Sequence, residues 1–208
     1  MPRRLRHFIP GCTQHLIQRG NNRGAIFRAA SDYQFFLALL RLASIQATVA
    51  IHGYVLMTNH FHVMATPSST DSVPKMMQSL GRLYVRFFND RYQRTGVLWE
   101  GRYRASMLHD ERYWVTCLRY IELNPVRAGL VVTAGAYRWS SYRAHALGAS
   151  DSNLTAHALY LGLGEGVVNR QAAWQTICAS PTSEDRLAEI RRAVHAGKAL
   201  GTPVFHQP

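Results

Sequence analysis

Cysteine, lysine and long apolar runs are all scarce in this sequence of 208 residues. The three cysteines, Cys12, Cys117 and Cys178, lie far apart, so they form neither a disulfide framework nor a CxxC zinc pattern. A reducing compartment suits such a chain, and we expect a cytoplasmic protein. No stretch approaches the roughly 18 apolar residues of a membrane-spanning helix, so we expect no membrane partner.

Acidic residues are also few: 12 stand against 24 basic ones, which gives a net charge of +12 at pH 7. Only Lys75 and Lys198 are lysines, so 22 of the basic residues are arginine, whose planar fork matches phosphate oxygens and stacks on flat rings. This balance favours a polyanionic partner, of which nucleic acid comes first. The hydrophobic share of 47% excludes a wholly disordered chain.

The spacing of apolar residues predicts alternating strands and helices. Strands are expected over 12–19, 48–57 and 60–66 and within 97–107; helices are expected over 32–46, from 71 onwards and over 110–124. Ser31 and Gln34 have capping-box spacing, and Pro125 should end the third helix. The order strand, helix, two strands, helix, strand, helix predicts an α+β domain with a ferredoxin-like antiparallel sheet.

The composition changes near Gly148. Residues 149–180 are small and polar with two short apolar patches, and residues 184–196 have the pattern of a charged helix. We therefore expect a main domain over residues 1–148 and a partly helical C-terminal appendage over residues 149–208. The sequence leaves the role of this appendage open.

A histidine pair gives the sharpest local signal, in Asn59-His60-Phe61-His62-Val63. Alternate residues of a strand share a face, so His60 and His62 should project together, ~7 Å apart along the strand, while Phe61 and Val63 face the core. Two imidazoles on one stiff strand can share a divalent cation. Two histidines on an exposed strand face would explain the pattern as well, so a metal site requires a third ligand.

The third predicted helix presents Tyr120 and Asn124 together, because residues four apart are neighbours on a helix surface. Asparagine offers a hard carbonyl oxygen that suits a metal, and a tyrosine phenol can act as a covalent nucleophile. Tyr113 lies two turns earlier on nearly the same face. Asn124 before Pro125 is also an ordinary helix-ending residue, so the helix by itself leaves both interpretations open.

Five blocks of sequence together carry a resemblance to a known family. They are residues 19–23 (RGNNR), 56–62 (LMTNHFH), 96–103 (GVLWEGRY), 119–130 (RYIELNPVRAGL) and 139–142 (WSSY). In this order they resemble the REP-associated tyrosine transposases, a branch of the HUH single-strand DNA transposases. The resemblance spans residues 11–142, about two thirds of the chain.

The resemblance implies a HUH nuclease domain and a role for several residues. The histidine motif of the family falls on His60-Phe61-His62, its nucleophilic tyrosine on Tyr120 and its third metal ligand on Asn124. The family implies Mg²⁺ or Mn²⁺ and a substrate of single-stranded DNA with REP-like hairpins. It also implies cleavage and strand transfer through a 5′-phosphotyrosine link. Imidazole ligands would suit Zn²⁺ at least as well as Mg²⁺.

Basic and aromatic residues beside the motifs are candidates for holding DNA. The arginines are Arg19, Arg23, Arg102, Arg104 and Arg127; the aromatic residues, which could equally be core, are Tyr103, Tyr137 and Trp139. Two alternatives stay open. A hydrolytic metal phosphodiesterase would not need Tyr120, and a domesticated binder of structured single-stranded DNA would need only the basic face. The sequence identifies no general base and leaves monomer and homodimer open.

Overall fold

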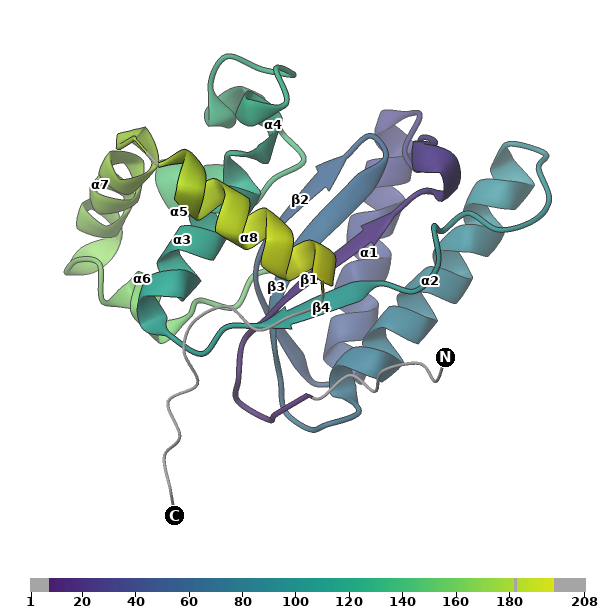
Figure 1. Ribbon diagram of the computed structural model, residues 1–208, viewed down its shortest axis with the longest axis horizontal. Coiled ribbons are helices and arrows are strands. Elements are labelled where there is room, and N and C mark those ends of the chain that lie inside the picture. Colours follow the sequence, from purple (N-terminus) through teal and green to yellow (C-terminus); the bar gives the residue numbers. More distant parts are fainter. Residues whose placement is uncertain (1–7, 182, 197–208) are drawn as a thin grey trace.

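The computed structural model of the protein describes residues 8–181 and 183–196 (Figure 1). Its elements are β1 (Gln14–Arg19), η1 (Asn21–Arg23), α1 (Ala30–Gln46), β2 (Val49–Met57), β3 (His60–Pro67), α2 (Ser72–Arg91), β4 (Arg104–Met107), α3 (Glu111–Glu122), α4 (Asn124–Arg127), η2 (Ala134–Ala136), α5 (Tyr142–Leu147), α6 (Ala158–Leu161), α7 (Gly166–Ala179) and α8 (Glu184–Ala196). Among the helices of the described residues, none has the length and apolar character needed to cross a bilayer.

Four antiparallel strands form one sheet in the order β2-β3-β1-β4. Thr58 and Asn59 join β2 to β3 as a two-residue hairpin, as the sequence predicts. The helices α1 and α2 are the crossovers that separate β1 from β2 and β3 from β4. This strand order and connectivity are those of the ferredoxin-like plan, so the predicted α+β class is confirmed.

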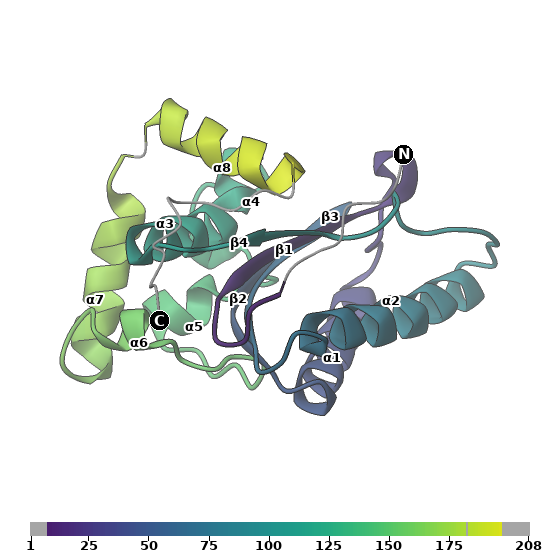
Figure 2. The same ribbon diagram turned by 60° about the horizontal axis from the view of Figure 1, so that its bottom comes forward.

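Helices cover both faces of the sheet (Figure 2). The helices α1 and α2 lie on one face, where they enclose a core that includes Phe36, Tyr84, Phe61 and Val63. On the other face lie α3 and α8, and a second core there includes Met64 and residues of both helices. Phe61 and Val63 thus point into the α1–α2 core, as strand alternation predicts, and the opposite face of β3 remains for its histidines.

Two helix ends differ from the sequence expectation. At the start of α1, the carboxylate of Asp32 accepts the backbone N–H groups of Arg28 and Ala29 at 2.8 and 2.9 Å, so Asp32 rather than Ser31 satisfies these donors. The helix α3 ends at Glu122 rather than at residue 124. Pro125 lies in the first turn of the short helix α4, where its missing N–H has no intrahelical partner to lose.

A buried carboxylate links α3 to the C-terminal region. Glu122 is fully buried, and its Oε1 accepts a hydrogen bond from Ser141 Oγ and lies 2.6 Å from His145 Nδ1 on α5. Its Oε2 accepts from the indole N–H of Trp174 on α7 at 2.8 Å. Trp174 belongs to the second core together with α8 residues. The boundary at residue 148 stays a prediction, and residues 197–208 of the expected appendage lie outside the described part.

We expect Glu122→Gln to lower the free energy of unfolding by about 3 kcal/mol. The NH₂ group of the glutamine would face side chains that now donate hydrogen bonds to the carboxylate. Urea denaturation measures the change. Glu165→Gln is the control: Glu165 is exposed and its side chain caps no backbone group, so its effect should stay within about 0.5 kcal/mol. A loss for Glu122→Gln as small as that of the control would contradict a structural role.

Candidate active site

The register of β1 against β3 decides which side chains meet on the α3 side of the sheet. Arg19 lies opposite His60, and Ile17 lies opposite His62. Directly opposed residues of antiparallel strands share a face, so Arg19 and both histidines project toward α3. The ring centroids of His60 and His62 lie 5.1 Å apart. The sequence prediction that these two rings project together is confirmed.

A third histidine, which sequence analysis missed, belongs to this cluster. His15 is fully buried, and its Nε2 lies 2.8 Å from Nδ1 of His62, within hydrogen-bond distance. His15 shares a face of β1 with Ile17 and Arg19 because all three alternate along the strand. That parity is readable in the sequence, but the pairing that brings His15 to His62 depends on the β1–β3 register.

Hydrogen bonds determine the form of the His60 ring. The amide of Asn59 is oriented because its Nδ2 donates to the carbonyl of Arg23 at 3.0 Å, which turns its Oδ1 toward Nδ1 of His60 at 2.7 Å. An amide oxygen only accepts, so Nδ1 of His60 is the donor in this bond, and the neutral form of the ring has its lone pair on Nε2. The β2–β3 turn therefore presets a tautomer in which Nε2 can ligate a metal.

Burial keeps the other two rings neutral. It lowers the pKa of His15 to about 3 and lowers the pKa of His62 well below its usual value, because the interior penalises the charged imidazolium. The neighbouring His15, His60, Arg127 and Arg19 lower the pKa of His62 further. At neutral pH both rings are uncharged, which is the form in which histidine binds metals.

Tyr120 lies beside this histidine cluster. Its ring centroid is 5.9 Å from that of His62 and 6.2 Å from that of His15. The guanidinium of Arg127 lies 4.2 Å from the centroid of the Tyr120 ring and donates to the Tyr120 carbonyl. Burial lowers the pKa of Arg127, and the nearby Tyr120 opposes part of that shift. A cation, a phenol and neutral imidazoles thus meet at one place.

Tyr113, the other tyrosine on this helix, has a different environment. Its hydroxyl donates to Glu189 on α8 at 2.7 Å, and the guanidinium of Arg186 lies 4.9 Å from its ring centroid. The hydrogen bond to Glu189 raises the pKa of Tyr113, with burial adding to the shift. Although two turns separate the tyrosines, Tyr113 faces α8 whereas Tyr120 faces the histidines.

Asn124, the expected third metal ligand, begins α4 one turn after Tyr120 and is half-buried. Within residues 8–181 and 183–196, no three side chains of histidine, cysteine, aspartate and glutamate gather as metal ligands would. A site with three protein ligands therefore needs a donor of another type, such as the carbonyl oxygen of an asparagine.

Four of the five candidate arginines line one polar cavity of about 250 Å³, together with Ile17, Gln18 and Glu100. They are Arg19, Arg23, Arg102 and Arg104. We call this space the arginine cavity. It adjoins the histidine cluster, because Arg19 pairs across the strands with His60. Arg127 is not among its lining residues and lies at Tyr120 instead.

Comparison with known proteins adds independent observations. Residues 9–124 match the family described as "Transposase IS200 like". Among curated protein sequences, none matches the chain. A solved REP-associated tyrosine transposase, bound to a REP hairpin, is similar with a TM-score of 0.58 and 18% identity, over 76% of this chain and 93% of its own.

Two further solved structures are more distant. A transposase structure from Deinococcus radiodurans has a TM-score of 0.42 at 16% identity, covering 58% of this chain and 96% of its own. The tRNA(His) guanylyltransferase of Saccharomyces cerevisiae has a TM-score of 0.44 at 10% identity, covering 96% of this chain and 82% of its own.

The chain shares its fold with the hairpin-bound transposase, and the family match spans more than half of the residues. The chain belongs to the IS200-like transposases, in agreement with its resemblance to the REP-associated tyrosine transposases.

Proposed function

We propose that this transposase cleaves single-stranded DNA beside a hairpin and transfers the strand through a 5′-phosphotyrosine on Tyr120. The observation that carries the proposal is the position of Tyr120, whose ring lies within 6.2 Å of the centroids of both His62 and His15 and under the guanidinium of Arg127. Every residue to which we give a chemical role precedes residue 148, and the nuclease domain over residues 1–148 stays a prediction.

The side chains suit a divalent cation, Mg²⁺ or Mn²⁺, held by His60, His62 and Asn124. Nδ1 of His60 donates to Oδ1 of Asn59, and Nδ1 of His62 lies within hydrogen-bond distance of Nε2 of His15, so each ring would ligate through its Nε2. Such outer hydrogen bonds orient metal-ligating histidines. When bound, the cation would withdraw charge from the scissile phosphate and orient it. His15 then acts as a positioning residue for His62.

In the transfer step, the phenolic oxygen of Tyr120 attacks phosphorus, the new O–P bond forms, and the bond from phosphorus to the 3′-oxygen breaks. The phenol loses its proton, and the departing 3′-oxygen gains one. The positive charge of Arg127 favours the negative charge that develops on Tyr120. One phosphodiester replaces another, so a later 3′-hydroxyl can reverse the step and join strands.

The DNA backbone would run through the arginine cavity toward Tyr120. Nε of Arg19 is buried and has no hydrogen-bond partner among the described residues, so a phosphate oxygen would satisfy it. The similar transposase is described as bound to a REP hairpin, which supports a hairpin substrate here. The opposed alternatives, a hydrolytic phosphodiesterase and a non-catalytic DNA binder, predict different outcomes for the variants below.

We expect His62→Ala to reduce cleavage of a labelled hairpin oligonucleotide by about 100-fold or more, because a metal ligand is lost. His109→Ala, at a half-exposed position after β4, is the control and should cleave normally.

His15→Ala should raise the Mn²⁺ concentration needed for half-maximal cleavage by about 10-fold and largely keep the rate at saturating metal. Full cleavage by the parent protein in EDTA would overturn the metal role.

We expect Tyr120→Phe to bind the hairpin with unchanged affinity but to form no denaturant-resistant adduct with it, because the nucleophilic oxygen is gone. Tyr113→Phe is the matched control on the same helix and should form the adduct. Gel electrophoresis and peptide mapping identify the linked residue. An adduct on Tyr113 would refute the assignment, cleavage without any adduct would favour the hydrolytic alternative, and binding without cleavage by the parent would favour the binder.

We expect hairpin binding to weaken with salt, since each neutralised phosphate of a single strand contributes a slope of ~0.7 in log K against log salt. Arg23→Gln removes one cation from the arginine cavity and should reduce this slope by ~0.7. Arg41→Gln on the exposed surface of α1 is the control and should leave the slope unchanged. Fluorescence anisotropy at several salt concentrations gives both slopes, and equal slopes would exclude a phosphate contact at Arg23.

A further inference from the structure

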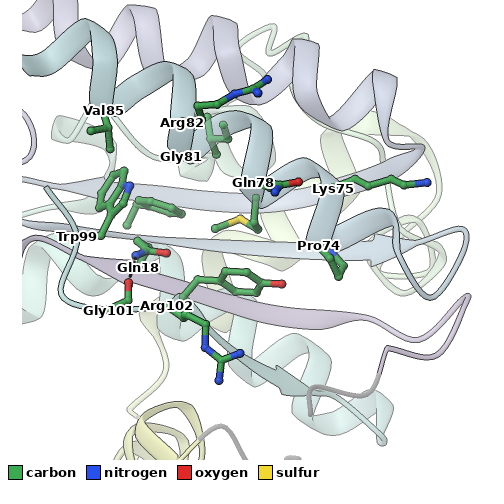
Figure 3. Close-up of a pocket in the computed structure, with 14 residues that line it drawn as sticks. Gln18, Pro74, Lys75, Gln78, Gly81, Arg82, Val85, Trp99, Gly101 and Arg102 are labelled. Carbon is green, nitrogen blue, oxygen red and sulfur yellow. Dashed lines mark hydrogen bonds between the residues drawn. The ribbon is translucent and has the colours of Figure 1, made fainter. Parts of the chain in front are cut away.

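A second and larger cavity lies on the sheet face opposite to Tyr120. It has a volume of about 720 Å³, which is in the range of sites for small ligands. Helix α2 forms one side of it, and the sheet together with the segment 99–103 forms the other (Figure 3). None of the residues proposed above for the metal or the nucleophile lines it. We call it the α2 cavity.

We propose that the α2 cavity binds one unpaired nucleobase of the single-stranded DNA that flanks the cleavage site. The proposal rests on the proposed function and extends it, because it names a place where the protein holds the DNA away from the reacting phosphate. Three observations support this occupant: aromatic walls, a nearly buried amide, and a cationic rim that continues into the arginine cavity.

The aromatic walls are preorganised. Phe61 and Trp99 meet edge to face with ring centroids 6.0 Å apart, and Trp99 stacks on Tyr84 at 6.1 Å. Tyr84 and Phe61 are buried in the α1–α2 core, so Trp99 is held by rigid neighbours. Tyr103 also lines the cavity and is half-buried. Fixed aromatic rings are the usual platforms on which unpaired bases stack.

A polar group suited to a base edge accompanies these rings. Gln18 is only 7% exposed, and its Nε2 donates to the carbonyl of Gly101 at 3.0 Å, a bond drawn in Figure 3. That bond fixes the amide, and its Oε1 accepts no hydrogen bond from the described residues. An acceptor held in a fixed position in this way fits the exocyclic amine of a base.

The charges at the rim favour an anion. Lys75, which pairs with Asp71, and the exposed Arg82 and Arg102 line the cavity, and among the described residues no acidic side chain lines it. Gln18 and Arg102 also line the arginine cavity, so the two cavities adjoin. A ligand with a flat ring and a phosphate on either side meets aromatic walls and cations together. A basic peptide would be repelled by the same rim.

The two cavities meet at the edge of the sheet, at Gln18 and Arg102. The pairing of β4 with β1 ends at Ile17 and Arg104, and beyond it the segment before β4 continues along β1, where the N–H of Glu100 donates to the carbonyl of Arg19 at 2.9 Å. The neighbours Arg19 and Gln18 point to opposite faces, Arg19 toward the histidines and Gln18 into the α2 cavity. A single strand that passes over Arg102, which lines both cavities, can place a phosphate in the arginine cavity and the adjoining base in the α2 cavity.

Gly81 on α2 allows a direct test. A methyl group there would meet Nε1 of Trp99 at 3.5 Å, an ordinary contact, so Gly81→Ala is the matched control. A leucine would extend into the α2 cavity and fill the place of the base. The probe is a hairpin oligonucleotide with a single-stranded flank in which each base in turn is removed to leave an abasic site.

We expect one flank position at which removal of the base weakens binding about 10-fold for the parent and Gly81→Ala, as the loss of a stacked base requires. Gly81→Leu should bind the complete flank about 10-fold more weakly and be insensitive to base removal at that position alone. A 2-aminopurine placed there should be quenched on binding to the parent and stay bright with Gly81→Leu. Circular dichroism establishes that both variants are folded.

A second variant, Gln18→Met, keeps the size of the side chain and removes the acceptor. It should retain the sensitivity to base removal and lose the preference among the four bases at that position. If every abasic position costs the parent and Gly81→Leu the same factor while the Tyr120 adduct still forms, the α2 cavity binds no base and the proposed chemistry stands. If the parent forms no adduct, the proposed function itself fails. The affinities of the abasic oligonucleotides, measured by fluorescence anisotropy, then decide by themselves whether the α2 cavity binds a base.

Discussion

The pairing of β1 with β3 is the constraint on which the site depends. Strand side chains alternate between faces, so a shift of one residue would turn His60 and His62 into the α1–α2 core and turn Phe61 and Val63 toward α3. The two-residue hairpin at Thr58 and Asn59 fixes β3 against β2, and the core formed by Phe61 and Val63 fixes its face. Packing against α1 and α2 therefore also orients the histidines on the other face.

The second constraint is the close approach of α3 to the sheet. A Cβ on Gly53 would lie 2.2 Å from the Cδ1 atom of Leu118, so only glycine lets α3 pack this closely on β2. One turn further along the same side of α3, Glu122 ties the helix to α5 and α7 through Ser141, His145 and Trp174. Tyr120 is thus held between two fixed contacts, and its ring faces the histidines because of both.

Local patterns in the sequence predicted the strands, the helices and the faces of β3. They could not predict contacts between segments that lie far apart in the sequence. The alternation in residues 60–63 predicted the two faces of β3, and the helical spacing predicted α3. The Asp110 carboxylate caps α3 by accepting the backbone N–H of Arg112. His15 was missed because its importance depends on a register between strands 47 residues apart. Glu122 lies outside the Tyr120 face, as its helical angle indicates, but its three partners come from α5, α7 and the segment before α5 and leave no local signal.

The polar groups buried around Tyr120 lower the free energy of unfolding. Their presence together at one place indicates a functional role. Nδ1 of His15 and Nε of Arg19 are buried without hydrogen-bond partners among the described residues. An unpaired buried polar group costs about 1–3 kcal/mol, and apolar residues in the same places would avoid that cost. The neutral rings of His15 and His62 also stand where the second core could accept aliphatic side chains. Departures from good packing that gather beside one phenol and one arginine cavity are expected at a site that binds an anionic substrate, because the substrate supplies the missing partners.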